Sequence, residues 1–458
     1  MKIIFINRFF YPDISATSQM LADQAFALAR DGHEVTVIAA QQSYDNASER
    51  LPASEVIDGV QIHRVWTSSF GRHRLRGRAL DYASFFVTAC AKLLTLVRRG
   101  DIVVTKTDPP MLSVLTTPLC ALRGAKSVNW LQDIFPEAAE RLGIGHGRAA
   151  RACHAALRAV RNFSLRRADQ NVVIGRVMRR QVQDLGVEAS RITEIPNWAD
   201  GSVIRPVTKD ANALRKEWGL GKHFVVAHSG NLGRAHDYRL FLEAMGLVEK
   251  EASGVAPQLE LATGGAPASD PEQSTSVRWL FVGGGVSFAG LEAGAADRQL
   301  KTVAFKPYQS RERLAESLSV ADAHLVTLRP ELEGLIVPSK VYGCMAAGRP
   351  IIFVGAKDGE VARLVRENRC GMVVSPDDAR ALANAIGELA ASPERAAWMG
   401  RNARRAFERS YDVRHAQGRW QRLIRELAQG QVVAKPVPDM PRNEEGLRPA
   451  VVRRFLGR

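Results

Sequence analysis

Short runs of apolar, mostly β-branched residues alternate with helix-like segments along almost the whole chain, and this alternation starts twice. The first round opens with Lys2–Ile6 and Val35–Ala40, and the second with Phe224–His228 and Val277–Gly283. Strands that read as continuous apolar runs are typical of parallel sheets, which helical crossovers cover on both faces. The chain is therefore predicted to be α/β, with two doubly wound Rossmann-like domains facing a cleft.

The two rounds of alternation set the domain boundaries. At 458 residues the chain exceeds what a single hydrophobic core ordinarily organises. We expect a first domain over residues 1–200 and a second over residues 201–428, with the last helix able to pack back on the first domain. Residues 429–458 have no apolar period and much Pro and Arg, so a basic, disordered tail is expected there. Ala252–Ser276 is expected to be a loose surface insertion.

The same patterns predict individual elements within each domain. The further strands are expected at Val60–Val65, Asp101–Thr105, Ser127–Leu131, Gln170–Ile174, Ser190–Pro196, Val303–Phe305, Ala323–Leu328 and Ile351–Val354. The helices are expected at Thr17–Arg30, Leu80–Val97, Met111–Ala121, Gly147–Arg167, Tyr238–Glu249, Ser310–Leu318 and Val341–Ala347. Thr17 or Ser18 is expected to cap the first of these helices, because hydroxyl side chains accept bonds from the first free N–H groups.

The charge balance is strongly basic. The 63 Lys and Arg residues exceed the 48 Asp and Glu residues, which favours partners rich in phosphate: nucleic acid, an anionic membrane surface or nucleotide substrates. Positive charge gathers in Arg72–Arg78 and Arg148–Arg180, near the apolar pairs Phe85–Phe86 and Leu93–Leu94. Basic and apolar residues interleaved at helical spacing suit an anionic membrane surface, although most arginine-rich helix faces are simply solvated.

Compartment and metal content are constrained by what the sequence lacks. The five cysteines are scattered without a CxxC pair, as expected for a reducing cytoplasmic compartment. The N-terminus has no signal-peptide pattern, and the apolar run Ala83–Val97 is broken by Lys92, so no transmembrane helix is expected. The histidines do not cluster, and neither HExxH nor DxD occurs, so no metal site is expected.

The segment Glu331–Pro350 is the richest in chemical signals. It follows a predicted strand and brings a carboxylate, a serine and a lysine to the start of a predicted helix. Open α/β sheets bind ligands at the carboxyl ends of their strands, and helix N-termini receive phosphate. The segment is therefore predicted to contact a phosphorylated, hydroxyl-rich ligand. Its candidate residues are Glu333, Pro338, Ser339 and Lys340.

Two glycine-rich loops also follow predicted strands of the second domain. Glycine lets the backbone approach a phosphate closely, and an arginine can neutralise the charge. A simple tight turn explains the first loop equally well, and the second loop is less diagnostic. Neither loop follows the first strand of the chain with the dinucleotide-binding pattern. The candidate residues are Gly230, Asn231, Gly233 and Arg234 in the first loop, and Gly283 and Gly284 in the second.

In the first domain, Asp133 follows a predicted strand and is placed to accept a proton from a bound hydroxyl group. The competing interpretation is an N-cap for a helix that begins near Pro136. Residues of the first strand–helix loop would face the same cleft, although capping and turn formation also account for them. The candidate acceptor-side residues are Asp13, Ser15, Thr17, Trp130 and Gln132.

Over about Met1–Leu427 the chain resembles the family 4 retaining glycosyltransferases of GT-B fold, in particular the branch of colanic-acid and O-antigen assembly. The most specific motif is EGLIVPSKVYGCMAAGRPI, and IIFINRFFYPD, WLQDIFPE, IPNWAD and SGNLG support it. The resemblance implies a metal-independent hexosyltransferase without a cofactor. It would move a sugar from a UDP- or GDP-type nucleotide sugar, with retention, to a lipid-linked saccharide acceptor in cell-surface polysaccharide assembly. It would then work in the cytoplasm, peripherally on the anionic inner face of the membrane.

The resemblance also implies roles for single residues. The first domain would bind the acceptor and the second the nucleotide sugar. Gly230–Arg234 would lie by the diphosphate, Glu333 near the transferred sugar, and Asp133 in the catalytic region of the first domain. Ser339 and Lys340 match the PSK signature of the branch.

Three positions depart from the family pattern. Gly343 stands where a second glutamate usually holds the ribose, and Ala235–His236 stands where a lysine usually follows the SGN loop. The first loop has Ser15–Thr17 in place of a double glycine. Two other functions stay open at this point: a nucleotide-sugar epimerase of the same fold, and a non-catalytic nucleic-acid-binding protein. The second is disfavoured because no recognised nucleic-acid-binding module occurs.

Overall fold

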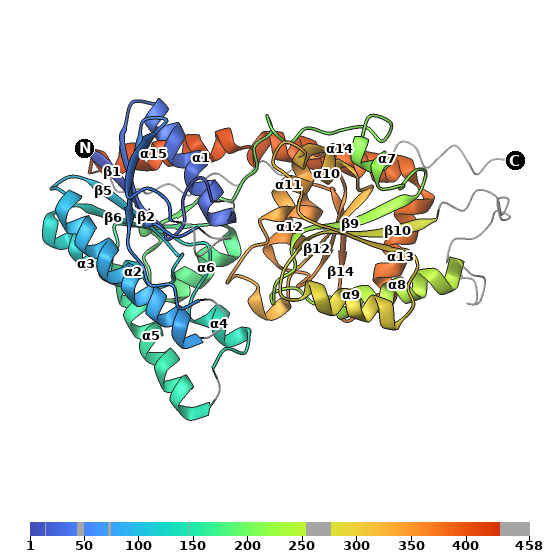
Figure 1. Cartoon of the computed structure of the whole chain (residues 1–458), viewed down its shortest axis with the longest axis horizontal. Coiled ribbons are helices and arrows are strands. Elements are labelled where there is room, and N and C mark those ends of the chain that lie inside the picture. The colour runs from blue at the N-terminus through green and yellow to red at the C-terminus, as the bar shows by residue number, and fades with distance from the viewer. Residues whose placement is uncertain (14, 44–49, 72–74, 146, 253–275, 431–458) are drawn as a thin grey trace, which may run out of the picture.

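The computed structural model describes residues 1–430 apart from 14, 44–49, 72–74, 146 and 253–275. It contains two α/β domains side by side, and the last two helices run along one edge of both (Figure 1). The prediction of two doubly wound parallel-sheet domains is confirmed. The expected insertion, apart from its ends, and nearly all of the expected tail lie outside the described residues.

The first domain is built on an eight-stranded sheet in the order β3-β4-β2-β1-β5-β6-β7-β8. All neighbouring strands run parallel except β3 and β4, which form an antiparallel pair at one edge. The edge strand β3 was not predicted, because its residues are alternately exposed and do not form an apolar run. The strands are β1 (Lys2–Ile6), β2 (Glu34–Ala40), β3 (Ser54–Ile57), β4 (Val60–Val65), β5 (Ile102–Lys106), β6 (Lys126–Trp130), β7 (Gln170–Val173) and β8 (Ile192–Glu194).

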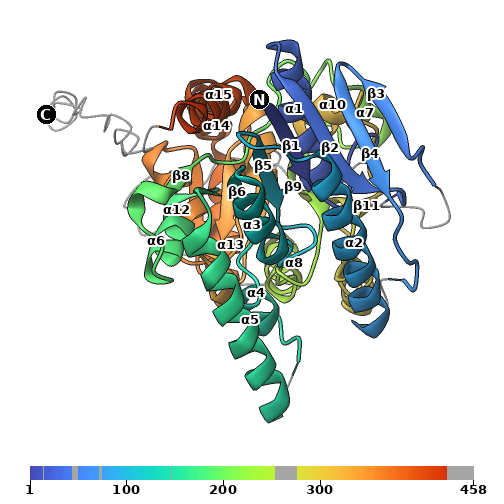
Figure 2. The ribbon, with the colours of Figure 1, turned by 90° about the vertical axis from the view of Figure 1, so that its left-hand side faces the viewer.

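Helices cover both faces of this sheet. On one face α2, α3 and α5 lie side by side (Figure 2), and the buried residues Phe85 and Leu93 of α2 pack against Ile4 and Ile6 of β1 in one core cluster. The helices of this domain are α1 (Ala16–Arg30), α2 (Leu75–Leu96), α3 (Ser113–Arg123), α4 (Glu137–Arg141), α5 (Gly147–Arg167) and α6 (Arg176–Asp184), with a 3₁₀ turn η1 (Ala189–Arg191).

The first helix is capped by Ser15 rather than by Thr17 or Ser18, so the predicted cap was wrong. Ser15 has an extended backbone (φ −61°, ψ 145°), and its side chain accepts a hydrogen bond from the Ser18 N–H at 3.4 Å. A cap needs this non-helical conformation, whereas Thr17 and Ser18 already lie inside the helix. The Thr17 hydroxyl instead donates to Asp108 Oδ2 at 3.4 Å, which ties the first loop to the loop after β5.

The second domain is built on a six-stranded parallel sheet in the order β11-β10-β9-β12-β13-β14. The strands are β9 (Phe224–Asn231), β10 (Val277–Gly284), β11 (Val303–Lys306), β12 (Ala323–Thr327), β13 (Ile351–Val354) and β14 (Gly371–Val374). The helices are α7 (Ala213–Glu217), α8 (Arg239–Ala252), α9 (Phe288–Asp297), α10 (Leu314–Ser319), α11 (Lys340–Ala346), α12 (Glu360–Glu367), α13 (Ala379–Ala391), α14 (Pro393–Ser410) and α15 (Val413–Ala428), with the 3₁₀ turn η3 (Pro330–Leu332).

The last helix, α15, belongs to the core of the first domain. Trp420 is fully buried, and its ring centroid lies 4.7 Å from that of Trp130 and 6.4 Å from that of Phe5. The chain passes between the domains at two adjacent places. There Ala199 N–H donates to Tyr411 O at 3.3 Å, and Val413 N–H donates to Ala199 O at 2.9 Å.

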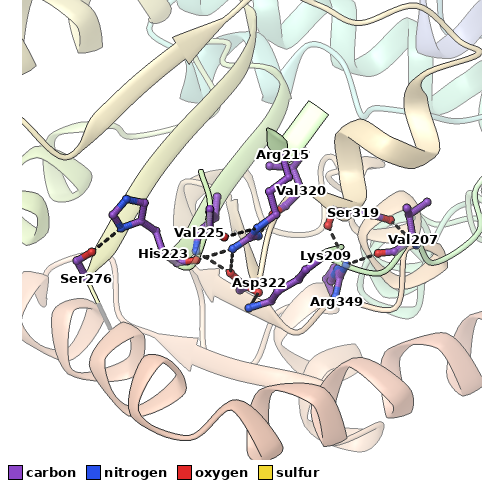
Figure 3. Close-up of polar contacts among 11 residues, drawn as sticks. Val207, Lys209, Arg215, His223, Val225, Ser276, Ser319, Val320, Asp322 and Arg349 are labelled. Atoms are coloured by element: carbon purple, nitrogen blue, oxygen red, sulfur yellow. Dashed lines mark hydrogen bonds and ion pairs between the residues drawn. The ribbon is translucent and has the colours of Figure 1, made fainter. Parts of the chain in front are cut away.

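A buried ionic network closes the amino end of the second sheet (Figure 3). Asp322, just before β12, accepts from Arg215 at 3.1 Å, from Lys209 at 2.6 Å and from the Val225 N–H at 2.8 Å. Arg215 also donates to the Val320 carbonyl at 2.6 Å. Because the charges are paired and hydrogen-bonded to backbone, this end of the sheet holds the linker after the first domain in place.

Candidate functional site

Lys340 connects two strand ends at the carboxyl edge of the second sheet. It begins α11, and its Nζ lies 2.9 Å from His228 Nε2 and 3.2 Å from Asn231 O. His228 is fully buried on β9, and Asn231 is the last residue of that strand. Desolvation lowers the pKa of the Lys340 ammonium to about 7. A lysine desolvated in this way gains strongly from a bound anion.

Two neutral histidines lie beneath this lysine. The rings of His228 and His236 are 5.7 Å apart, and His236 Nδ1 bonds to Thr327 O at 2.8 Å. Burial, and then the charge of Lys340, lowers the pKa of His228 well below its ordinary value and that of His236 to about 3. Both imidazoles are therefore uncharged at neutral pH. Sequence reasoning assigned no role to His228, and its position one residue before SGNLG was the available signal.

The two glycine loops are packed backbone against backbone. Gly230 and Gly283 have positive φ values, 109° and 134°, and a Cβ on Gly283 would lie 2.4 Å from Gly230 O. A Cβ on Gly285 would lie 2.2 Å from Asn231 Oδ1. Glycine is therefore required sterically at Gly283 and Gly285, and the positive φ favours glycine at Gly230. A Cβ on Gly230 would also be 4.0 Å from Lys340 Cε, so the lysine and the first loop are direct neighbours.

The remaining donor-side candidates lie around this centre in different settings. Ser339 occupies the position before α11, and its side chain makes no capping bond there. Pro338 is buried beside it. Gly233 O accepts a hydrogen bond from Ser287 Oγ at 3.3 Å, and the side chain of Arg234 is exposed. The structure therefore brings Lys340 to the first glycine loop and leaves Arg234 on the surface next to it.

Tyr308 lies beside the second glycine loop. Its ring is 3.1 Å from where a Cβ of Gly283 would be and 3.4 Å from that of Gly284. More than half of its surface is accessible, at 57%. An exposed aromatic ring over glycine backbone offers a flat apolar surface next to the candidate phosphate site. Sequence reasoning did not single it out.

Glu333 holds the start of α12. Its Oε1 accepts a hydrogen bond from the Glu360 N–H at 2.8 Å, and a Cβ on Gly359 would lie 2.3 Å from its Oε2. The carboxylate thus fits a space that glycine leaves open at a helix N-terminus, where negative charge is favoured. Burial nevertheless raises the pKa of Glu333. This contact orients the carboxylate and leaves Oε2 without a partner among the described residues.

Glu360 extends this chain of contacts into the first domain. Its Oε2 accepts from the Val177 N–H of α6 at 3.1 Å, and its other oxygen pairs with Arg363. A Cβ on Gly175 would lie 2.7 Å from Glu360 Cδ. Glu333 and Glu360 therefore link the loop before α11 to α12, and α12 to α6. Sequence reasoning missed Glu360, because the contact joins residues 183 positions apart.

Asp133 lies at the boundary between the domains. It forms an isolated bridge with Ile336, which also pairs with Glu333, and Ile134 N–H donates to Leu335 O at 2.9 Å. Desolvation raises the pKa of Asp133 to about 6, although a hydrogen bond with Thr107 opposes the shift. The N-cap interpretation of Asp133 was wrong, because Pro136 occupies the position before α4. The backbones of the two candidate catalytic carboxylates thus meet at one residue.

The acceptor-side candidates divide between the surface and the core. Trp130 is fully buried, stacked on Trp198 with ring centroids 5.9 Å apart, so its side chain packs the core and cannot touch a ligand in this conformation. Gln132 exchanges two hydrogen bonds of 3.0 Å with Asn197. Asp13, Ser15 and Thr17 stay partly accessible in the first loop.

A lysine that sequence reasoning missed lies under that loop. Lys106 Nζ donates to Thr17 O at 2.7 Å and lies 3.9 Å from the centroid of the Trp130 ring. Burial lowers the pKa of Lys106 to about 7, against the opposing charges of Asp108 and Asp23. The ammonium therefore holds the backbone of the first turn of α1, directly after the first loop.

Two family models match the chain in succession. One described as Glycosyl transferase 4-like domain matches residues 16–198, and one described as Glycosyl transferases group 1 matches residues 210–406. The probable glycosyltransferase WbjE of Pseudomonas aeruginosa is 31% identical over 322 residues, which cover 69% of this chain and 72% of that protein. The putative colanic acid biosynthesis glycosyl transferase WcaI of Escherichia coli is 25% identical over 411 residues, covering 86% of this chain and 93% of that protein.

Solved structures share the whole two-domain arrangement. Sucrose-phosphate synthase from Thermosynechococcus elongatus superposes with a TM-score of 0.70 at 18% identity, over 94% of this chain and 100% of that chain. Anabaena Alr3699/HepE in complex with UDP-glucose superposes with a TM-score of 0.66 at 16% identity, also over 94% of this chain and 100% of that chain. At these identities the likeness shows the fold.

Proposed function

The chain belongs to the glycosyltransferase family described by the 4-like and group 1 domains, and from this premise we propose which reaction it catalyses. It transfers a hexosyl group, with retention of configuration and without a metal ion, from a UDP- or GDP-sugar to a lipid-linked saccharide. The single observation that carries the proposal is the contact of Lys340 with His228 and Asn231 at the end of β9. It places a desolvated ammonium at a glycine loop whose backbone a phosphate can approach.

The lysine accounts for a departure from the family pattern. The cation usually found beyond the SGN loop is absent from the sequence there, where Ala235 and His236 stand instead. Lys340 supplies a cation to the same loop from α11, with its Cε 4.0 Å from where a Cβ of Gly230 would be. Preorganised positive charge stabilises the nucleoside diphosphate as it leaves, and it does so most strongly where water is excluded.

Glu333 and Asp133 have different roles in the proposed reaction. Glu333, held by the N-terminus of α12, orients hydroxyl groups of the transferred sugar with its Oε2. Asp133, with a pKa raised to about 6, positions the acceptor hydroxyl and accepts its proton. Their shared neighbour Ile336 lies four residues before Lys340, so an extended chain allows at most about 14 Å between those two Cα atoms. The Asp133 backbone therefore lies beside the loop that carries Glu333 and leads to Lys340.

The names of the relatives support a nucleotide-sugar donor and a role in polysaccharide assembly. HepE, which shares the fold, is solved with UDP-glucose, and WcaI is named for colanic acid biosynthesis. We infer that this chain acts in cell-surface polysaccharide assembly, on the cytoplasmic side of the membrane where nucleotide sugars are available. A basic first domain suits an acceptor that carries a lipid diphosphate.

The experiment that tests the proposal is a thermal-shift screen with UDP, GDP, dTDP, ADP and their common sugars. A ligand that binds only the native state raises the melting temperature by mass action. We expect one nucleoside diphosphate, UDP or GDP, to stabilise the protein above the others, and Lys340→Met to abolish that shift. Absence of any shift in the wild-type protein would overturn the proposal. Donor turnover should also require an added acceptor, which an epimerase would not.

A further inference from the structure

The three helices that cover one face of the first sheet present apolar side chains to solvent. Helices α2, α3 and α5 lie side by side in both views (Figures 1 and 2), and α3 contacts both of the others. Residues seven apart return to nearly the same side of a helix, and α2 and α3 each expose one such pair. The outward residues are Leu80 (53% exposed), Val87 (70%), Leu115 (41%), Leu122 (78%), Val160 (45%) and Phe163 (59%), which we call the three-helix face.

Helix α2 is apolar on its inner side as well. Phe85, Ala89 and Leu93 are fully buried in the core of the first domain. A helix that only covers a core has a polar outer side, so an apolar outer side needs another explanation. By length and composition alone, Gly77–Leu96 is the one helix in the described part of the chain that could cross a membrane, with 22% of its most apolar window buried. Because its inner side holds the core, the outer side is the part available for contact.

The charge of these helices has one sign. Their sequences contain ten Lys and Arg residues and one acidic residue, Asp81, which is buried. Arg158 and Arg161 of α5 are paired with Glu140 and Glu137 of α4 and are therefore engaged within the protein. Further arginines are exposed: Arg123, Arg148, Arg151, Arg166 and Arg167. The three helices thus expose both apolar and cationic side chains, and Arg167 lies over the ring of Phe163 with its guanidinium carbon 5.5 Å from the centroid.

We propose that the three-helix face docks the protein onto an anionic lipid bilayer. Interleaved apolar and basic side chains on surface helices match the acyl boundary and the anionic headgroups of such a bilayer. The apolar residues are spread over three helices, which suits a broad fluid surface better than a single peptide groove. In the second domain, the large apolar side chains that are mainly exposed among the described residues are Val286, Tyr308 and Trp398. The inference rests on the proposed function, because a lipid-linked acceptor presents its sugar at a membrane surface.

This assignment corrects the apolar contacts expected from sequence. Phe85 and Leu93, which the basic-and-apolar pattern placed at the membrane, belong to the core instead. The contact is made by Leu80 and Val87 on the other side of the same helix. The exposed arginines come from α3 and α5, which the sequence could not show to be neighbours of α2.

The test is vesicle flotation of the full chain at low and high salt. The probes are vesicles of phosphatidylcholine alone and vesicles that also contain phosphatidylglycerol. We expect flotation with the anionic vesicles at low salt and a large loss at high salt, because surface attraction falls off within a Debye length. Wild-type protein that stays unbound to anionic vesicles at low salt would overturn the proposal.

Two sets of substitutions separate the apolar from the electrostatic contribution. The apolar set is Leu80→Gln, Val87→Gln and Leu122→Gln, and the charge set is Arg148→Gln, Arg151→Gln and Arg167→Gln. A basic residue near an anionic surface contributes about fivefold to partitioning, so the charge set should weaken binding at least about tenfold. The apolar set should also weaken binding at least about tenfold, because each substitution removes apolar surface that would enter the bilayer. The matched controls in the second domain, which should bind as the wild type does, are Val286→Gln for the apolar set and Arg401→Gln with Arg405→Gln for the charge set.

Three further outcomes would also overturn the proposal: variants that float like the wild type, controls that lose as much binding, or a dimer in sedimentation that the apolar set dissociates. The last would assign the face to a second copy of the chain. Melting temperatures check that every variant folds. The nucleotide-induced thermal shift is read in the same samples, so failure of the donor site and failure of membrane docking are told apart.

Discussion

The two ends of the second sheet carry similar charged residues and use them differently. At the amino end, Arg215 donates four hydrogen bonds, to the carbonyls of Gly221, Val320 and His223 and to Asp322. At the carboxyl end, Lys340 contacts His228 and Asn231 O. A guanidinium has five N–H donors and an ammonium three, so Arg215 and Lys340 both use most of their hydrogen-bonding capacity. The two side chains differ in the partners that they contact.

The partners at the amino end are backbone carbonyls and an ionised carboxylate, all of which are fixed by the fold. The partners at the carboxyl end are a neutral imidazole and the Asn231 carbonyl, and no carboxylate contacts the ammonium among the described residues. Where a buried charge is fully compensated within the protein, removing one partner leaves the other buried without its counter-charge and destabilises the fold. A charge that is desolvated and uncompensated is held ready for a ligand of opposite sign. We therefore predict that substitutions at the amino end of the second sheet lower stability, and that substitutions at the carboxyl end lower turnover.

The largest expected effect is on stability at the amino end. Arg215→Met leaves Asp322 buried with Lys209 as its remaining cation, so the free energy of unfolding should fall by about 3–5 kcal/mol. Urea denaturation measures it. The affinity of the folded fraction for nucleoside diphosphate should not change. A loss of affinity without a loss of stability would contradict the assignment of the amino end to stability.

The next effect is on turnover at the carboxyl end. Lys340→Met should lower kcat by about 10²–10³, the cost of removing one preorganised group that stabilises a leaving oxyanion. Its melting temperature should not decrease, because burial of the ammonium opposes folding. The matched control is Lys209→Met, a lysine at the opposite end of the same sheet. Similar activities for the two variants would remove the distinction between the ends.

The protonation of Lys340 predicts how ligand binding at the carboxyl end depends on pH. Because the pKa of Lys340 is lowered from 10.5 to about 7, the ammonium loses its proton above neutral pH in the free protein. Nucleoside diphosphate affinity should then fall by up to about tenfold per pH unit, and titration calorimetry should detect proton uptake on binding. In the unfolded chain Lys340 keeps its proton up to about pH 10.5, whereas in the folded protein it loses the proton above about pH 7. The free energy of unfolding should therefore increase between about pH 7 and 10.5 because of this one group. Lys340→Met should show neither effect.

The smallest effect on stability is expected at Glu333, which contacts the N-terminus of α12 and is also the proposed ligand of the transferred sugar. Glu333→Gln keeps an oxygen that can accept from the Glu360 N–H and removes a charge that burial disfavours, so the free energy of unfolding should change by less than about 1 kcal/mol. Urea denaturation measures this change, with Glu331→Gln, on the 3₁₀ turn just before Glu333, as the exposed control. Sugar transfer should fall by more than this change in stability explains. Unchanged transfer would leave Glu333 with the capping role alone.

The sequence predicted elements that depend on local pattern and missed contacts that depend on tertiary packing. Gly147–Arg167 and Ile351–Val354 have the predicted bounds, because periodicity and chain breakers determine them locally. The half-exposed strand Ser54–Ile57 was missed because its register comes from its partner strand.

The candidate site shows the same division. The motif around Lys340 could be found from its residue types at a strand end, and the lysine does meet the first glycine loop. Its partner His228 was not assigned, because a lone histidine in an apolar strand is usually structural; its place directly before SGNLG was the one signal that could have pointed to it. Glu360 and Lys106 act through contacts with residues far away in sequence. Trp130 lies at the strand end where an acceptor-side residue was expected, but the rings of Trp198 and Trp420 enclose its side chain in the core.

The paired crossing at Ala199 and Val413 makes the second domain an insertion within the first. Stopping the chain at residue 200 would remove Trp420 and leave the first core open, so the first domain is not a simple amino-terminal fragment. The segment between the two crossings, by contrast, enters and leaves at adjacent backbone positions. Under the proposed function, it could be exchanged as a cassette with the matching segment of a relative, and the donor preference should change while the first domain stays the same.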